Sequence, residues 1–111
     1  MPHGISVALT APEACRFTFA ASPVRHLRAA YLLAPETEQP GDPAQMLPSA
    51  LTERRNEIGI PNGIGGVGYD KDDIDDLVPG TMQQQRVLAT APRPVREEDI
   101  AGIPLRSLAL W

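Results

Sequence analysis

Proline is the feature that most limits what this chain can fold into. Twelve of the 111 residues are proline, about twice the average share. Proline lacks a backbone N–H and clashes with the preceding helical turn, so each one tends to shorten or bend a helix or strand. Prolines at this density predict several short elements joined by turns. They stand at Pro2, Pro12, Pro23, Pro35, Pro40, Pro43, Pro48, Pro61, Pro79, Pro92, Pro94 and Pro104.

Length and charge exclude several classes of protein. A chain of 111 residues and 12.0 kDa has room for one modest domain, so a nucleotide-binding domain and a substrate domain do not both fit. The formal net charge is −4 and the basic residues are scattered, which argues against a nucleic-acid-binding surface. No apolar run approaches the ~18 residues of a membrane span. We therefore expect neither nucleic acid nor a membrane as a partner.

Cysteine use indicates a reducing compartment. The single cysteine, Cys15, cannot form an internal disulfide or a paired-cysteine zinc site. Because the first residues also lack the layout of a signal peptide, we expect a cytoplasmic protein. No neighbouring His or Lys pattern would lower the pKa of Cys15, so its expected role is that of a small buried hydrophobe.

The first segment can be read in two ways. Ile5, Val7 and Leu9 alternate with small or polar residues as in a strand, yet Ile5 and Leu9 also share one helical face. Pro12 limits either element to about two helical turns or one short strand. Periodicity alone leaves this choice open.

The next segment carries clearer signals of a helix. Ser22 is a good N-cap residue and Pro23 suits the first helical position, so a helix is expected over about residues 23–33. The stretch that follows, about residues 34–43, is rich in Pro, Gly, Glu and Gln and is expected to be a loop.

The sequence pattern predicts further helices after this loop, and therefore an all-α fold. Pro48 weakens one first turn, so a firm helix is expected only from about residue 49 to 58. Asp70 caps another helix, whose acidic first turn complements the helix dipole. The last helix begins with acidic residues at Glu97 and is interrupted by Pro104, with Leu108 and Leu110 continuing its apolar face.

Two motifs suggest ligands but fail when their spacing is checked. Gly63, Gly65 and Gly68 match the G-x-G-x-x-G phosphate pattern, which needs a preceding strand and an acidic residue ~20 positions later. A helix precedes them instead, and Leu88 holds that later position. We interpret the segment as a glycine-rich turn.

The second motif is an aspartate cluster. It consists of Asp70, Asp72, Asp73, Asp75 and Asp76. A calcium loop starting at Asp70 would need Gly at its sixth position and Glu at its twelfth, which Asp75 and Thr81 occupy. We interpret the cluster as a solvated helix start.

The two histidines, His3 and His26, are the natural candidates for metal binding or proton transfer. They lie 23 residues apart, with no local spacing that would bring both to one site. His26 stands between Arg25 and Arg28 and is expected to be a surface residue. The residues alone leave the role of His3 open.

Several short motifs, taken in order, nevertheless resemble one family. Pro2-His3-Gly4 is similar to the Pro-His-Gly segment of iron-containing alcohol dehydrogenases. The rest resembles the hydroxyacid-oxoacid transhydrogenase branch of that family over nearly the whole chain. The matching segments are Pro23-Val24-Arg25-His26-Leu27, Gly59-Ile60-Pro61-Asn62-Gly63, Val67-Gly68-Tyr69, Asp72-Asp73-Ile74, Gly80-Thr81, Pro92-Arg93-Pro94 through Glu98-Asp99, and Trp111.

This resemblance implies a fold and one site residue. Residues 1–111 would be the C-terminal portion of the family's helical metal-binding domain, with about five short helices and a helix directly after His3. The N-terminal nucleotide-binding domain would be absent. In the family one Asp and three His hold a divalent metal, usually iron, and the last of these is the His of Pro-His-Gly. The resemblance therefore implies that His3 is a metal ligand, and it transfers no catalytic or cofactor-binding residue.

The resemblance also implies a chemistry for the full-length enzyme. That chemistry is hydride transfer between a hydroxyacid such as 4-hydroxybutyrate and an oxoacid such as 2-oxoglutarate through NAD(H), with Fe²⁺ or Zn²⁺ polarising the reacting oxygen. One imidazole does not retain a metal for which roughly three protein ligands are typical. We therefore expect a fragment that alone binds neither metal nor NAD and is inactive. The alternatives are a non-catalytic helical remnant or interaction module, and one half of a split enzyme completed by a separate nucleotide-binding polypeptide.

Overall fold

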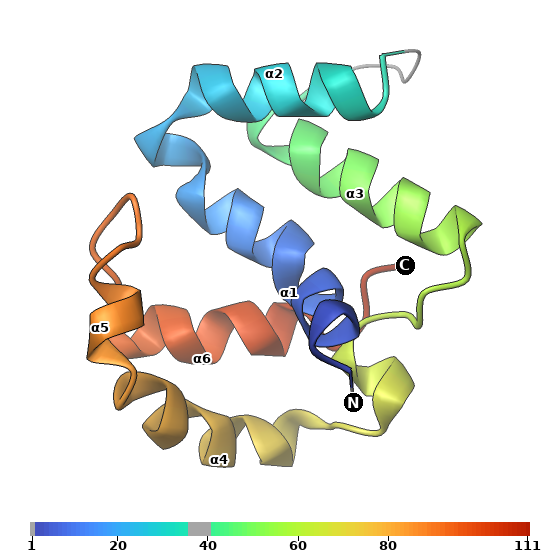
Figure 1. Cartoon of the computed structure of the whole chain (residues 1–111). Coiled ribbons are helices and arrows are strands. Elements are labelled where there is room, and N and C mark those ends of the chain that lie inside the picture. Colours follow the sequence, from blue (N-terminus) through green and yellow to red (C-terminus); the bar gives the residue numbers. More distant parts are fainter. Residues whose placement is uncertain (1, 36–40) are drawn as a thin grey trace.

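The computed structural model describes residues 2–35 and 41–111, and all its regular elements there are helical (Figure 1). The expected all-α fold is thereby confirmed. The α-helices are α1 (His3–Thr18), α2 (Pro23–Leu33), α3 (Met46–Glu57), α4 (Lys71–Met82), α5 (Gln85–Leu88) and α6 (Glu97–Arg106). Three short 3₁₀ segments are η1 (Phe19–Ala21), η2 (Pro43–Gln45) and η3 (Ile64–Val67). Within the described ranges, no helix is both long and apolar enough to span a membrane.

Helix α1 lies between two helix pairs. It packs against α3, which pairs with α2, and also against α6, which pairs with α4 (Figure 1). The main hydrophobic core fills the space between α1, α4, α6 and η3. Its buried members are Leu9, Ile64, Ile74, Val78 and Ile100. The α2–α3 side buries small residues instead, which lets those two helices approach closely: Ala30, Ala34 and Ala50.

Pro12 does not end the first element, so that sequence prediction was wrong. Helix α1 continues past Pro12 for six further residues, to Thr18. The helix loses one backbone hydrogen bond at this point. The Pro12 ring is fully buried, however, and its burial offsets that loss. The helix directly after His3 that the family resemblance implied is confirmed.

The predicted disruption of helices at Pro48 and Pro104 was also too strong. Helix α3 begins at Met46, ahead of Pro48, because the first-turn residues of a helix need no intrahelical acceptor for their N–H groups. Helix α6 runs through Pro104 and ends at Arg106. Leu108 then lies beyond α6, so it does not extend the helix face as predicted.

The remaining helix predictions agree with the structure to differing degrees. Helix α2 has the predicted bounds, although the side chain of Ser22 makes no capping hydrogen bond. Asp70 does cap α4, and its carboxylate accepts from the N–H groups of Asp72 and Asp73. Helix α5 was not foreseen. Of the loop predicted over about residues 34–43, residues 36–40 lie outside the described part of the chain.

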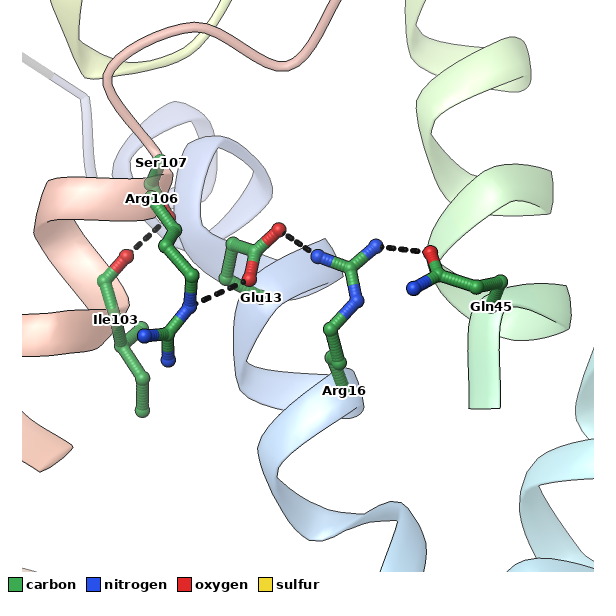
Figure 2. Close-up of polar contacts among 6 residues, drawn as sticks. All are labelled: Glu13, Arg16, Gln45, Ile103, Arg106 and Ser107. Atoms are coloured by element: carbon green, nitrogen blue, oxygen red, sulfur yellow. Dashed lines mark hydrogen bonds and ion pairs between the residues drawn. The ribbon is translucent and has the colours of Figure 1, made fainter. Parts of the chain in front are cut away.

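A buried carboxylate ties the central helix to both sides of the fold (Figure 2). Glu13, only 5% exposed, accepts from Arg16 on its own helix and from the Nε of Arg106 on α6 at 3.1 Å. Arg16 in turn donates to the side-chain oxygen of Gln45, in η2, at 2.5 Å. The four side chains thus connect α1 to α6 and to the segment that leads into α3.

The C-terminal tail docks on the glycine-rich turn. The N–H groups of Ile64 and Gly65 donate to the carbonyl oxygens of Ser107 at 2.8 Å and Leu108 at 3.0 Å. The side-chain oxygen of Asn62 accepts from the N–H groups of the last two residues, at 2.6 and 3.1 Å. The tail therefore lies against residues 62–65.

Gly63→Ala should destabilise the fold through this contact. Gly63 has φ +66°, and an added Cβ would overlap the carbonyl oxygen of Ser107 and lie 2.6 Å from that of Leu108. We expect a loss of about 2 kcal/mol or more in unfolding free energy, measured by urea denaturation followed by circular dichroism.

Gly80→Ala is the matched control. Gly80 is exposed in α4, and a Cβ there meets nothing within 4 Å. Replacing a helical glycine by alanine should stabilise the chain by about 0.5–1 kcal/mol. Equal effects of the two substitutions would show that the tail contact does not constrain Gly63.

Candidate functional site

His3 is the first residue of α1, and its side chain is exposed. Two hydrogen bonds hold the turn around it. The Ser6 hydroxyl donates to the His3 carbonyl at 2.7 Å, and the Ser6 N–H donates to the Pro2 carbonyl at 3.1 Å. A side chain at Gly4 would meet nothing within 4 Å, so the space beside this turn is open. The Pro-His-Gly segment therefore presents an imidazole on a rigid, accessible helix start.

The chemistry of His3 fits a single metal ligand. Among the described residues its imidazole makes no hydrogen bond or ion pair, so its ring nitrogens are free to bind a group from outside. In residues 2–35 and 41–111, no three His, Cys, Asp or Glu side chains come together as a group that could hold a metal. The residues present thus fit one position in a coordination sphere and not a complete site.

His26 is held by its neighbours and does not join His3. Its Nδ1 lies 2.8 Å from the Ser22 carbonyl and its Nε2 lies 2.8 Å from the Thr18 hydroxyl. A carbonyl oxygen can only accept, so Nδ1 donates to it and Nε2 of the neutral ring accepts from Thr18. The ring also meets Phe19 edge-on, with centroids 5.9 Å apart.

The prediction that His26 is a plain surface residue was therefore wrong. The side chain is half-buried and joins the end of α1 to the start of α2. Thr18 and His3 occupy opposite ends of α1, about 22 Å apart along the helix axis at 1.5 Å per residue. The structure assigns His26 to the packing of the α1–α2 connection.

The glycine-rich turn directs its N–H groups into its own chain. Those of Ile64 and Gly65 donate to the C-terminal tail, and those of Gly66 and Gly68 donate to carbonyls of the turn itself. A phosphate-binding loop would instead point such groups at its ligand. The geometry agrees with the interpretation of this segment as a turn.

The aspartate cluster begins a helix. The carboxylate of Asp73 accepts from the N–H of Asp70 at 2.9 Å, while that of Asp70 accepts from the N–H of Asp72 at 2.9 Å. These reciprocal contacts form a capping box, in which two N–H groups that lack helical partners are satisfied. Two of the five aspartates are thus occupied as helix caps.

Cys15 is half-buried in α1, and burial raises the pKa of its thiol. A raised pKa keeps the side chain in the neutral thiol form, which is a poor nucleophile. This environment is compatible with the packing role expected from the sequence.

Sequence reasoning passed over two charged side chains, Glu13 and Arg55. Arg55 is 6% exposed, and none of its three guanidinium nitrogens has a hydrogen-bond partner in the described part of the chain. The only sequence signal for its burial is helical spacing, because Arg55 follows the buried Pro48 by seven residues and shares its face. Glu13 follows the core residue Leu9 by four residues, and this helical spacing is a similarly weak signal of its burial.

Comparison with known proteins decides the family. The model of the Fe-containing alcohol dehydrogenase family, C-terminal, matches residues 1–108. This chain belongs to that family. The resemblance seen in the sequence motifs is thereby confirmed.

The relatives of this family member include mitochondrial hydroxyacid-oxoacid transhydrogenases. The bovine protein (Bos taurus) is 37% identical over 113 residues, covering 100% of this chain and 24% of its own length. The human protein (Homo sapiens) is 38% identical with the same coverage. A probable hydroxyacid-oxoacid transhydrogenase of Dictyostelium discoideum is 33% identical and is covered over 21% of its length. The chain spans about a quarter of the length of these relatives, and no solved structure matches it.

The expected cytoplasmic location is contradicted by these relatives. The bovine, human and Dictyostelium proteins are all named as mitochondrial. The expectation rested on the single cysteine and on the layout of the first residues. Cysteine use indicates a reducing environment but does not distinguish one reducing compartment from another.

The thiol of Cys15 should react slowly in the folded chain. At pH 8 its raised pKa reduces the thiolate fraction and burial restricts access, so alkylation by iodoacetamide should be at least about tenfold slower than in urea. Mass spectrometry reads the reaction directly because the chain has one cysteine. A Cys15→Ser variant gives the background, and equal rates in the folded and unfolded chains would contradict the assigned environment.

Proposed function

We propose that residues 1–111 form the C-terminal portion of the helical domain of a metal-dependent hydroxyacid-oxoacid transhydrogenase, and that His3 is one of its metal ligands. The observation that carries this proposal is the Pro-His-Gly imidazole, exposed and unpartnered among the described residues at the start of α1. Membership of the Fe-containing alcohol dehydrogenase family supports it.

The proposed role of His3 depends on a neutral imidazole with an open nitrogen. When bound, a divalent metal such as Fe²⁺ or Zn²⁺ would act as a Lewis acid on the alcohol or carbonyl oxygen of the substrate. His3 would hold one side of that metal. Helix α1 would fix the direction of the imidazole, because Glu13 anchors the helix to its neighbours. The reaction proposed for the whole enzyme is hydride transfer between a hydroxyacid such as 4-hydroxybutyrate and an oxoacid such as 2-oxoglutarate through NAD(H).

The rest of the reaction centre is proposed to come from outside this chain. His3 is a single donor, and catalytic metals of this kind typically have about three protein ligands. The proposal therefore assigns no catalytic or NAD-binding residue to residues 1–111, and it predicts that the chain alone is inactive.

Exposed apolar side chains support the proposal that another domain, which binds the nucleotide, packs against this chain. On α2, Val24, Tyr31 and Leu32 are each more than half exposed. Their spacing places them along one helix, and apolar surface of this kind marks sites that other protein elements cover. In the proposal, a nucleotide-binding domain in the same or a separate polypeptide completes the enzyme.

The first test uses the purified chain alone. We expect no stoichiometric iron or zinc by inductively coupled plasma mass spectrometry, and no NADH-dependent turnover of 4-hydroxybutyrate with 2-oxoglutarate. Stoichiometric metal together with turnover would contradict the single-ligand assignment.

The second test places this chain in a complete enzyme. Residues 1–111 would replace the matching segment of the bovine relative, and the metal content of the chimera would be measured. His3→Ala should lower metal affinity by about 10-fold or more, while His26→Ala, the matched control, should leave it unchanged. A His3→Ala chimera that retains its metal would remove His3 from the ligand set.

A further inference from the structure

Arg55 is a buried cation without a counter-charge. It lies in the last turn of α3 with 6% of its surface exposed, and Nε, Nη1 and Nη2 are each inaccessible and without a hydrogen-bond partner. A guanidinium carries five N–H donors, and arginine is almost never fully buried unless it is paired. Among the described residues, no carboxylate forms an ion pair with it.

Other arginines in the chain have side-chain or backbone partners of the kind that Arg55 lacks. Arg16 and Arg106 both reach the carboxylate of Glu13. Arg93 lies over the Phe17 ring at 4.2 Å and also donates to the Phe17 carbonyl at 2.9 Å. Within residues 2–35 and 41–111, the Arg55 guanidinium has only the ring contact, with Cζ 5.9 Å from the centroid of Trp111.

Glu57 does not supply the partner. Glu57, two residues further along α3, is paired with Arg54 at 3.0 Å. The backbone of Arg55 is fixed as well, because its carbonyl accepts from the Ile60 N–H at 3.0 Å. The guanidinium is thus buried with its donors unused, and burial lowers its pKa without removing its charge.

Trp111 is the aromatic neighbour of the Arg55 guanidinium. The C-terminal segment leaves α6 and ends near the last turns of α3 (Figure 1), where the Trp111 ring faces Arg55 while 46% of the residue remains exposed. Its backbone is held through one side chain, that of Asn62, which contacts both its N–H and its carbonyl oxygen. The ring itself is part of no helix, because α6 ends at Arg106.

We propose that Arg55 binds the carboxylate group of a small organic acid, with Trp111 moving aside to admit it. A carboxylate is planar and accepts two parallel N–H bonds from a guanidinium, which makes it the smallest anion that satisfies the fork. A compact planar group suits a position where each nitrogen is now covered by protein atoms. This inference goes beyond the proposed function and does not depend on it, because it concerns a residue other than His3 and needs no metal.

The only tryptophan of the chain is Trp111, so its fluorescence reports on the site directly. The chain would be titrated with acetate and succinate at constant ionic strength. The controls would be acetamide and succinamide, which have the same shapes without the charge. We expect a saturable change in emission and a rise in Tm of about 5 °C near saturation with the acids, and neither with the amides.

Substitutions separate the site from general salt effects. Arg55→Met keeps the apolar stem and removes the charge, so the response to acids should vanish, and the free variant should have a higher Tm than the parent. Arg55→Lys keeps the charge without the fork and should bind at least about tenfold more weakly. Arg93→Met is the matched control, since Arg93 also lies on an aromatic ring, and it should keep the full response.

Four results would overturn the proposal, and three of them come from the parent chain. Absence of any acid-dependent change in emission and Tm would contradict it, as would an equal change with the amides. An unaltered response in Arg55→Met would place the binding elsewhere. Phosphate binding as strong as that of succinate would contradict the assignment of a planar carboxylate.

Discussion

The buried carboxylate of Glu13 is the interaction on which the rest of this fold depends. An unpaired carboxylate in that position would cost several kcal/mol, so its burial requires cationic partners. Arg16 and Arg106 supply them, and their side chains remain 33% and 52% exposed. Most of the desolvation therefore falls on Glu13 alone, while both cations keep contact with water. This asymmetry makes the three-residue cluster a favourable connection between helices.

The position of the C-terminal tail follows from the same cluster. Arg106 is the last residue of α6, and Gly102 leaves space for its guanidinium to lie along the helix toward Glu13. Ser107, fully buried, comes next and places the tail against the glycine-rich turn. The tail then carries Trp111 to Arg55. The Glu13 carboxylate thus connects the C-terminal tail to the helix that begins with His3, because it pairs with Arg106 on α6 and with Arg16 on α1.

Local signals in the sequence predicted the elements whose determinants are themselves local. The bounds of α2, the cap at Asp70 and the acidic first turn of α6 depend on neighbouring residues, and all three agree with the structure. The prediction at Pro12 was too severe because a local rule counts the lost hydrogen bond and omits burial. The Pro12 ring is among the most buried groups in the chain.

The candidate site was predictable only in part. A short motif identified His3, and the structure gives it a suitable place without testing whether it binds metal. The burial of Glu13 depends on a partner 93 positions away, which no local pattern reveals. Arg55 was missed, and His26 was assigned to the surface, because the roles of both residues are decided by packing between segments. Charge and periodicity alone describe such residues as solvated.

A double-mutant cycle between Glu13 and Arg106 tests this account most directly. Urea denaturation would give the free energies of unfolding of the parent, Glu13→Gln, Arg106→Gln and the double variant. The reference pair is the exposed Arg96 and Glu98, whose Nη1 and Oε1 atoms lie 3.8 Å apart. We predict a coupling free energy of about 1 kcal/mol or more for Glu13 and Arg106, against less than about 0.5 kcal/mol for the reference pair. Equal coupling in the two pairs would contradict the central role given to the Glu13 carboxylate.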